Sequence, residues 1–200
     1  NVLVRKAEGI ETAGSLNILF SDKTGTITKG RLEVVDFFTA DGTSIPIPEL
    51  GSHTEIKKML DLAIGKNTQS LFDASHQVIG GNATDQALMK FMGEEAFNAV
   101  NADQSLVITA SQGFNSANKF SQARIDSVGR TFYKGAPEKL LAQAVNFLDS
   151  DGREKAIDQA ALNKKIDELA SKAMRVLAFG YSKKPMKENT IHNDLVIIGL

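Results

Sequence analysis

The spacing of apolar residues changes partway along this 200-residue chain, and that change limits the folds it can adopt. Residues 53–65 and 82–92 place apolar side chains three and four positions apart, which predicts two helices. Residues 105–109, 119–126 and 130–134 are short strand-like runs divided by turn residues, which is typical of an antiparallel meander. Hairpins and helical pairs in this order favour an α+β fold, with an antiparallel β-sheet flanked by helices.

The segments around this region complete the expected layout. Thr84 is a candidate N-cap for the second helix, and Gly113 and Asn115 mark the first turn of the meander. Pro137 opens a further helix that runs to Val145. The remaining expected elements are a long amphipathic helix at 156–174 and strands at 17–20, 32–38, 175–181 and 195–200.

Composition excludes several classes of function. The net charge of −1 provides no basic field for nucleic acid, so no nucleic-acid partner is expected. The absence of cysteine rules out disulfides, thiolate zinc sites and a cysteine nucleophile, and the three histidines show no metal-ligand spacing. No stretch approaches the roughly 20 consecutive apolar residues that a membrane-spanning helix needs. We therefore expect the chain itself to be soluble.

An aspartate at the end of a predicted strand is the strongest candidate for chemistry. Asp22 follows the apolar run 17–20 and precedes Lys23, Thr24 and Gly25. In open α/β sheets ligands bind beyond the carboxyl ends of the strands, where a carboxylate can attack a phosphoryl group and form an acyl phosphate. A nearby lysine and hydroxyl, a glycine that turns backbone amides toward phosphate, and a cation such as Mg²⁺ suit that transfer. Composition alone would favour an ordinary surface turn.

The string from Ser21 to Thr28, Ser-Asp-Lys-Thr-Gly-Thr-Ile-Thr, resembles the phosphorylation signature of the P-type ATPases. The resemblance implies that Asp22 is the residue phosphorylated by ATP and that Lys23 and Thr24 surround the phosphate. It also implies that Asp22 and the backbone carbonyl of Thr24 bind Mg²⁺. The expected enzyme is therefore an ion-translocating ATPase, with ATP and Mg²⁺ as cofactors.

The second half of the chain carries another string of the same family. The chain has no Walker A motif and no Gly-x-Gly-x-x-Gly loop. Lys134-Gly-Ala-Pro-Glu138, which alone would be a turn with proline early in a helix, resembles the nucleotide-domain signature of type II P-type ATPases, most like the calcium pumps. The resemblance places Lys134 in an adenosine pocket and counts Gly135 among the nucleotide-binding residues.

Three further segments resemble the family's nucleotide domain. The helix start around Asp85 implies that this carboxylate meets the adenine amino group, although the family has the longer glutamate there. The segment from Phe114 to Lys119 implies that the aromatic ring stacks on adenine and that the lysine approaches the phosphates. An aromatic face suits a base and an ammonium suits a phosphate. The strand that Arg175 opens implies that the guanidinium reaches the phosphates.

The resemblance also implies a domain arrangement. Residues 1–33 would be the start of a haloacid-dehalogenase-like phosphorylation domain, 34–190 the nucleotide-binding domain, and 191–200 a strand that returns to the phosphorylation domain. The rest of that domain, the actuator domain and the transmembrane helices have no counterpart in this sequence. We therefore expect a cytoplasmic fragment of an integral membrane pump, inactive alone, with ATP and the other pump domains as partners. The transported ion expected is calcium.

Two other classes of function stay open at this point. A haloacid-dehalogenase-like phosphatase with a large cap carries a similar string, but it has an acid/base aspartate where Thr24 stands here. Rapid hydrolysis of small phosphate esters would support that class. A non-catalytic nucleotide-binding module would bind nucleotide without phosphorylation of Asp22 in the longer protein.

Overall fold

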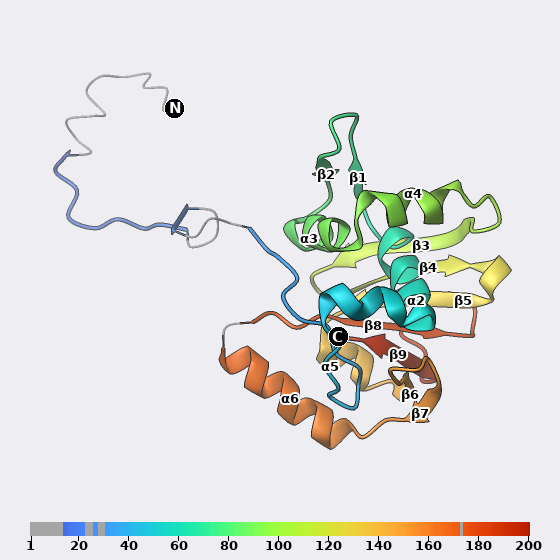
Figure 1. Ribbon diagram of the computed structural model, residues 1–200. Helices are drawn as coiled ribbons and strands as arrows, with labels where there is room; N and C mark the ends of the chain where they lie inside the picture. Colours follow the sequence, from blue (N-terminus) through green and yellow to red (C-terminus); the bar gives the residue numbers. More distant parts are fainter. Residues whose placement is uncertain (1–13, 23–25, 28–30, 173) are drawn as a thin grey trace. The chain divides into compact units, whose positions relative to one another are not determined.

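The computed structural model describes residues 14–22, 26–27, 31–172 and 174–200. The chain divides into two units, residues 1–31 and 32–200, and each is considered by itself. The second unit combines a seven-stranded sheet with flanking helices (Figure 1), which confirms the α+β class. In spatial order the strands are β3 (Ile108–Asn115), β4 (Phe120–Ile125), β5 (Arg130–Gly135), β8 (Ala178–Ser182), β9 (Leu195–Gly199), β6 (Ala144–Leu148) and β7 (Glu154–Ala156).

The sheet is mixed instead of wholly antiparallel. Strands β3, β4, β5, β8 and β9 pair antiparallel in turn, whereas β9 and β6 run parallel. The predicted meander at 105–134 corresponds to β3, β4 and β5. A separate two-stranded hairpin is formed by β1 (Ser70–Phe72) and β2 (Val78–Gly80).

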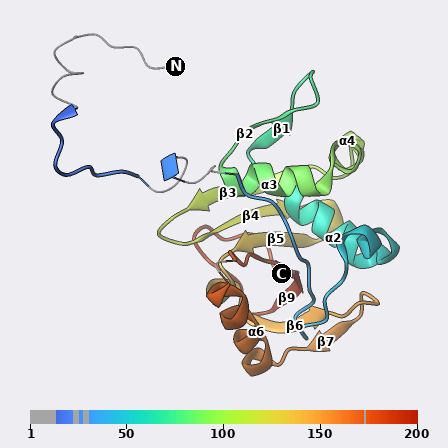
Figure 2. The same ribbon diagram turned by 60° about the vertical axis from the view of Figure 1, so that its left-hand side comes forward.

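Helices cover both faces of the sheet because apolar residues alternate along its strands. Within β9, Val196 and Ile198 join one apolar cluster while Leu195 and Ile197 join the other. The first cluster includes residues of α2 (Thr54–Gly65) and α3 (Ala83–Met92), and the second includes residues of α5 (Pro137–Leu141) and α6 (Gln159–Ser171). Figures 1 and 2 both show α6 well apart from α2 and α3. The remaining helical elements are α4 (Glu94–Ala102) and the 3₁₀ turns η2 (Ile47–Ser52) and η3 (Asp126–Val128).

The strands predicted at 17–20 and 32–38 are not strands in the structure. Ile18 and Phe20 are 71% and 94% exposed, and no strand among the described residues pairs with 17–20. In the second segment Phe37 and Phe38 are buried, and backbone pairing there is confined to isolated contacts among the described residues, a bridge of Phe38 with Ser44 and two hydrogen bonds of Phe38 with Leu200. An apolar run becomes a strand only when several successive residues pair with a neighbouring strand, and contacts at a single residue do not suffice.

Local boundaries were also wrong where tertiary pairing decides them. The first meander strand was expected at 105–109, yet β3 runs to Asn115, so Gly113 and Asn115 lie within it. The helix expected to reach Val145 ends at Leu141, because Ala144 and Val145 belong to β6, which lies beside β9. Helix α6 is shorter than predicted, and β8 begins three residues after Arg175.

The C-terminal segment lies inside the sheet. Residues 191–200 were expected to return to a separate phosphorylation domain. They contain β9, which pairs with β8 on one side and β6 on the other. This segment is therefore an internal part of the unit 32–200. Among the helices of the described residues, none has both the length and the apolar character to cross a bilayer.

Candidate functional site

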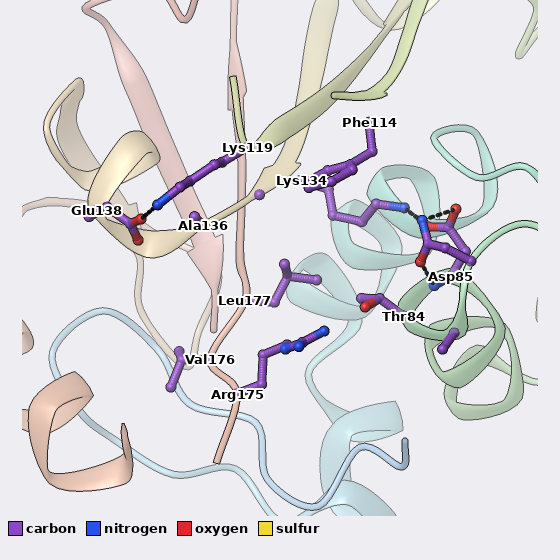
Figure 3. A pocket seen from close by; sticks show the side chains of 13 residues that line it. Thr84, Asp85, Phe114, Lys119, Lys134, Ala136, Glu138, Arg175, Val176 and Leu177 are labelled. Carbon is purple, nitrogen blue, oxygen red and sulfur yellow. Dashed lines mark hydrogen bonds and ion pairs between the residues drawn. The ribbon is translucent and has the colours of Figure 1, made fainter. Parts of the chain in front are cut away.

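A cavity of about 660 Å³ opens between the start of α3, the β3–β4 hairpin, the end of β5 and the residues that precede β8. Figure 3 shows side chains from all four segments directed toward this space. The six residues that the sequence predicts to bind nucleotide all line it. They are Asp85, Phe114, Lys119, Lys134, Gly135 and Arg175.

A buried ion pair forms one wall of the cavity. Lys134 and Asp85 are each only 5% exposed, and the Lys134 Nζ atom lies 2.5 Å from the Asp85 Oδ1 atom. The same ammonium donates to the backbone carbonyl of Asn67 at 2.6 Å. Burial lowers the pKa of Lys134, and the Asp85 carboxylate opposes that shift. The pair links β5 to α3, so the wall depends on both charges.

Asn82 orients Asp85 at the start of α3. The Asn82 Oδ1 atom accepts from the Asp85 backbone N–H at 2.9 Å, and the Asn82 side-chain amide donates to Asp85 Oδ2 at 3.3 Å. Asn82 is thus the N-cap, and the prediction of Thr84 for that role was wrong. Both residue types cap helices well, but here the amide also holds the carboxylate. The positive end of the helix favours an acid at this position.

Phe114 reaches the cavity through a bulge in β3. Gln112 pairs with Gln122 and Asn115 with Phe120, so two residues of β3 oppose one residue of β4. A bulge of this kind bends the strand and redirects a side chain. Phe114 is 54% exposed and lines the cavity, as Figure 3 shows.

Exposed charged groups line the part of the cavity away from the Lys134–Asp85 ion pair. The Lys119 ammonium lies 3.1 Å from the Glu138 carboxylate, and both side chains are more than half exposed. Arg175 is exposed and precedes β8, and its side chain points toward Thr84 in Figure 3. Two exposed cations therefore border the cavity, one of them paired with a carboxylate.

Gly135 permits the close approach of β4 and β5. A Cβ atom added there would lie 2.6 Å from the Lys119 carbonyl oxygen and 2.6 Å from the Phe120 Cβ atom. Both are closer than ordinary van der Waals contact. Any larger residue would therefore displace the strand that follows Lys119, which indicates a spacing role beside its position in the cavity wall.

Sequence reasoning did not assign Asn82 and Glu138 to the site. Both residues stand within strings that resembled the family, and both line the cavity. The preference of asparagine for N-cap positions was the available signal for Asn82. For Glu138 no local signal existed, because its role depends on Lys119, which is 19 residues away.

The predicted phosphorylation site belongs to the other unit. Asp22 is exposed, while Lys23 and Thr24 lie outside the described residues. Among the residues that the structure describes, no group of three or more acidic or histidine side chains could hold a metal ion. The proposed Mg²⁺ ligands Asp22 and Thr24 therefore stay a prediction.

The arrangement suits a ligand with an aromatic part and an anionic part. A half-exposed aromatic ring offers a stacking face, and Lys119 and Arg175 offer charge to an anion. The volume falls within the range of small-molecule sites. A nucleotide has both required parts.

Comparison with known protein families agrees with this chemistry. The family model described as "P-type ATPase, cytoplasmic domain N" matches residues 55–200. That match covers most of the chain, including the four segments that line the cavity.

Curated relatives extend the similarity to the whole chain. A plasma-membrane-type calcium-transporting ATPase of Arabidopsis thaliana is 30% identical over 223 residues, covering 100% of this chain and 21% of the relative. Calcium-transporting ATPase 1 of Saccharomyces cerevisiae is 30% identical over 232 residues, covering 99% of the chain and 24% of the relative. A sodium/potassium-transporting ATPase α subunit of Artemia franciscana is 29% identical over 203 residues, covering 90% and 20%. The chain thus spans less than a quarter of the length of these three proteins.

Proposed function

This chain belongs to the cation-transporting P-type ATPases, and from that membership we propose that residues 32–200 bind ATP for a calcium-transporting pump. The observation that carries the proposal is the gathering of the six predicted nucleotide-binding residues around one cavity. The phosphatase alternative does not account for this cavity, because hydrolysis of small phosphate esters needs no base-stacking ring.

ATP would lie in the cavity with its base toward Phe114 and its phosphates toward Lys119 and Arg175. Stacking on the exposed Phe114 ring holds the base, and the two cations balance the phosphate charge. Asp85 is the proposed partner of the adenine amino group. The Asp85 carboxylate already accepts from Lys134 and Asn82. The adenine amino group would therefore donate to a carboxylate oxygen that these two contacts hold in place.

In the longer protein Asp22 would receive the γ-phosphoryl group. A carboxylate oxygen of Asp22 forms a bond to the γ-phosphorus, while the bond from that phosphorus to the bridging oxygen breaks and ADP leaves with the bond's electron pair. Lys23 and Thr24 are the proposed neighbours of the transferred phosphate, and a bound Mg²⁺ would reduce repulsion between the two anions. The first unit, residues 1–31, would thus belong to the start of a phosphorylation domain.

The location and the partners follow from the same proposal. The remaining phosphorylation, actuator and transmembrane domains would belong to the same longer protein, and this chain would lie on the cytoplasmic side of the membrane. Calcium is the proposed ion because the Lys134–Glu138 string resembles calcium pumps. The relatives include both calcium-transporting and sodium/potassium-transporting ATPases.

Titration with a fluorescent ATP analogue tests the division of roles between the two units. We expect wild type and the Asp22→Asn variant to bind with the same affinity, because Asp22 contributes to transfer and the cavity lies in the other unit. In the full-length pump the same variant should form no acid-stable phosphoenzyme. Loss of nucleotide binding by Asp22→Asn alone would contradict the proposal, and absence of binding by wild type would refute it.

Removing the charge of Glu138 should strengthen nucleotide binding. The Glu138 carboxylate neutralises Lys119 and repels phosphate, so we expect Glu138→Gln to lower the Kd for ATP about 2–5-fold, the range of an exposed ion pair. The gain should shrink in high salt, because salt screens exposed charges. Titration at low and high salt measures both effects, with the exposed Glu95→Gln as the matched control. Equal gains in the two variants would show a general charge effect instead.

A further inference from the structure

The segment that joins β8 to β9, residues 183–194, crosses three strands of the sheet before it returns. We call it the β8–β9 connection. The Lys184 carbonyl accepts from the Thr131 hydroxyl of β5 at 2.8 Å, and the Lys187 carbonyl accepts from the Gln122 side-chain amide of β4 at 2.9 Å. Its next residues reach β3. The connection thus runs from the middle of the sheet to its edge.

Asn189 is the point of contact between this connection and β3. Its backbone N–H donates to Gln112 Oε1 at 2.8 Å, and its Oδ1 atom accepts from Gln112 Nε2 at 2.8 Å. The same Oδ1 atom accepts from the Asn118 side-chain amide at 2.5 Å. Asn189 has a φ of 54°, a left-handed conformation that asparagine tolerates better than most residues. One residue therefore bonds to both sides of the β3–β4 hairpin.

The hairpin that Asn189 holds carries two residues of the candidate site. Gln112 stands two positions before Phe114, and Asn118 stands directly before Lys119. β3 is an edge strand with β4 as its only neighbour in the sheet, and the bulge interrupts their ladder at Phe114. The Lys119 carbonyl has a second restraint, since it accepts from the Ala136 N–H at 2.9 Å. On the side that precedes Phe114, the Gln112 side chain bonds to Asn189 and to the Gln122 side-chain amide of β4, so Asn189 is the contact that joins this part of β3 to the β8–β9 connection.

We propose that Asn189 is a positioning residue for the nucleotide site, which fixes the β3–β4 hairpin so that Phe114 faces the cavity. The inference rests on the proposed nucleotide-binding function. Without the Asn189 side chain, the hairpin would lose two of its three hydrogen bonds to Asn189, those from the Gln112 and Asn118 side-chain amides, and Phe114 would sample orientations that do not stack on a base. Asn189 itself does not line the cavity, so its effect passes through Phe114.

Replacement by glycine tests this role without backbone strain. Asn189→Gly keeps the left-handed conformation and the backbone N–H but removes the Oδ1 acceptor. We expect its Kd for a trinitrophenyl-ATP probe to rise about 3–10-fold, as the loss of one or two neutral hydrogen bonds allows. Asn189→Asp retains the Oδ1 acceptor and should restore affinity. The matched control is Asn193→Ala in the same connection, since Asn193 accepts from Lys184; its affinity should equal that of wild type.

A double-mutant cycle separates positioning from general stability. The effect of Asn189→Gly should vanish in the Phe114→Ala background and persist in the Arg175→Ala background, because only the former removes the ring that Asn189 positions. If the glycine variant does not fold, Asn118→Ala repeats the test from the hairpin side. The positioning role of Asn189 would be contradicted by equal affinities of wild type and Asn189→Gly, or by a loss of affinity that persists in the Phe114→Ala background. Neither result would contradict the proposed nucleotide binding. A wild-type chain that binds no nucleotide would overturn the proposed function as well.

Discussion

Replacement of Lys134 by methionine is expected to lower the free energy of unfolding by about 3–5 kcal/mol, as for other broken buried ion pairs. Methionine keeps most of the side-chain volume but leaves the Asp85 carboxylate 5% exposed with no cation beside it. The backbone carbonyl of Asn67 loses its donor at the same time. Thermal and urea unfolding would measure the change, and the melting temperature should fall by roughly 10 °C.

Lys119→Met is the matched control for this prediction. It removes a lysine of the same cavity that also has a carboxylate partner, but both groups of that pair are more than half exposed. An exposed pair of this kind contributes about 0–1 kcal/mol, so its loss should hardly change stability. Lys119→Met should instead weaken ATP binding, because the ammonium faces the proposed phosphate position. Equal destabilisation by the two variants would contradict the buried character of the Lys134–Asp85 pair.

A second variant separates the unpaired charge from other effects of the substitution. Adding Asp85→Asn to Lys134→Met removes the unpaired buried carboxylate, so the double variant should recover at least half of the lost free energy of unfolding. Failure to recover would indicate that the contact of Lys134 with Asn67 matters more than the ion pair. Neither outcome alters the predicted role of Asp22, which lies in the other unit.

Helices and the meander were predictable from the chain because their signals are local. Residues 54–65 carry an apolar stripe that α2 buries, and the run 130–134 became β5 almost unchanged. In contrast, Ala144 and Val145 continue the spacing of the helix before them, yet they belong to β6. Their conformation is decided by pairing with β9, about 50 residues later. No periodicity within the segment could reveal that partner.

In the candidate site, too, residues within local strings were predictable, whereas features that depend on contacts between distant segments were not. Lys134, Phe114 and Arg175 were predicted because each stands in a string that resembles the family, and the fold brings all three to one cavity. The orientation of Phe114 could not be predicted, because it depends on the β3 bulge, and the bulge arises from the register of β3 against β4. Sequence reasoning also missed Asn189, which is 75 residues after Phe114 and meets the hairpin only through the path of the β8–β9 connection.

Truncation of the Phe114 ring should separate nucleotide affinity from stability. Phe114 is 54% exposed, so Phe114→Ala removes little buried surface and should change the free energy of unfolding by less than about 1 kcal/mol. Stacking of a base on an aromatic ring contributes about 1–3 kcal/mol, so the Kd for ATP should rise roughly 5- to 150-fold. Calorimetric titration with ATP, paired with thermal unfolding of the same samples, would measure both quantities.

Tripolyphosphate provides the decisive comparison, because it has a triphosphate chain like that of ATP and no base. Its affinity should not change in Phe114→Ala but should fall in Arg175→Ala, which removes a cation at the cavity. Phe114→Tyr preserves an aromatic face and should bind ATP about as well as wild type. If Phe114→Ala weakens tripolyphosphate and ATP equally, the ring supports the shape of the β3–β4 hairpin instead of the base. That result would contradict the proposal that Phe114 stacks on the base. It would not affect the proposal that Arg175 binds the phosphates, which the loss of tripolyphosphate affinity in Arg175→Ala tests separately.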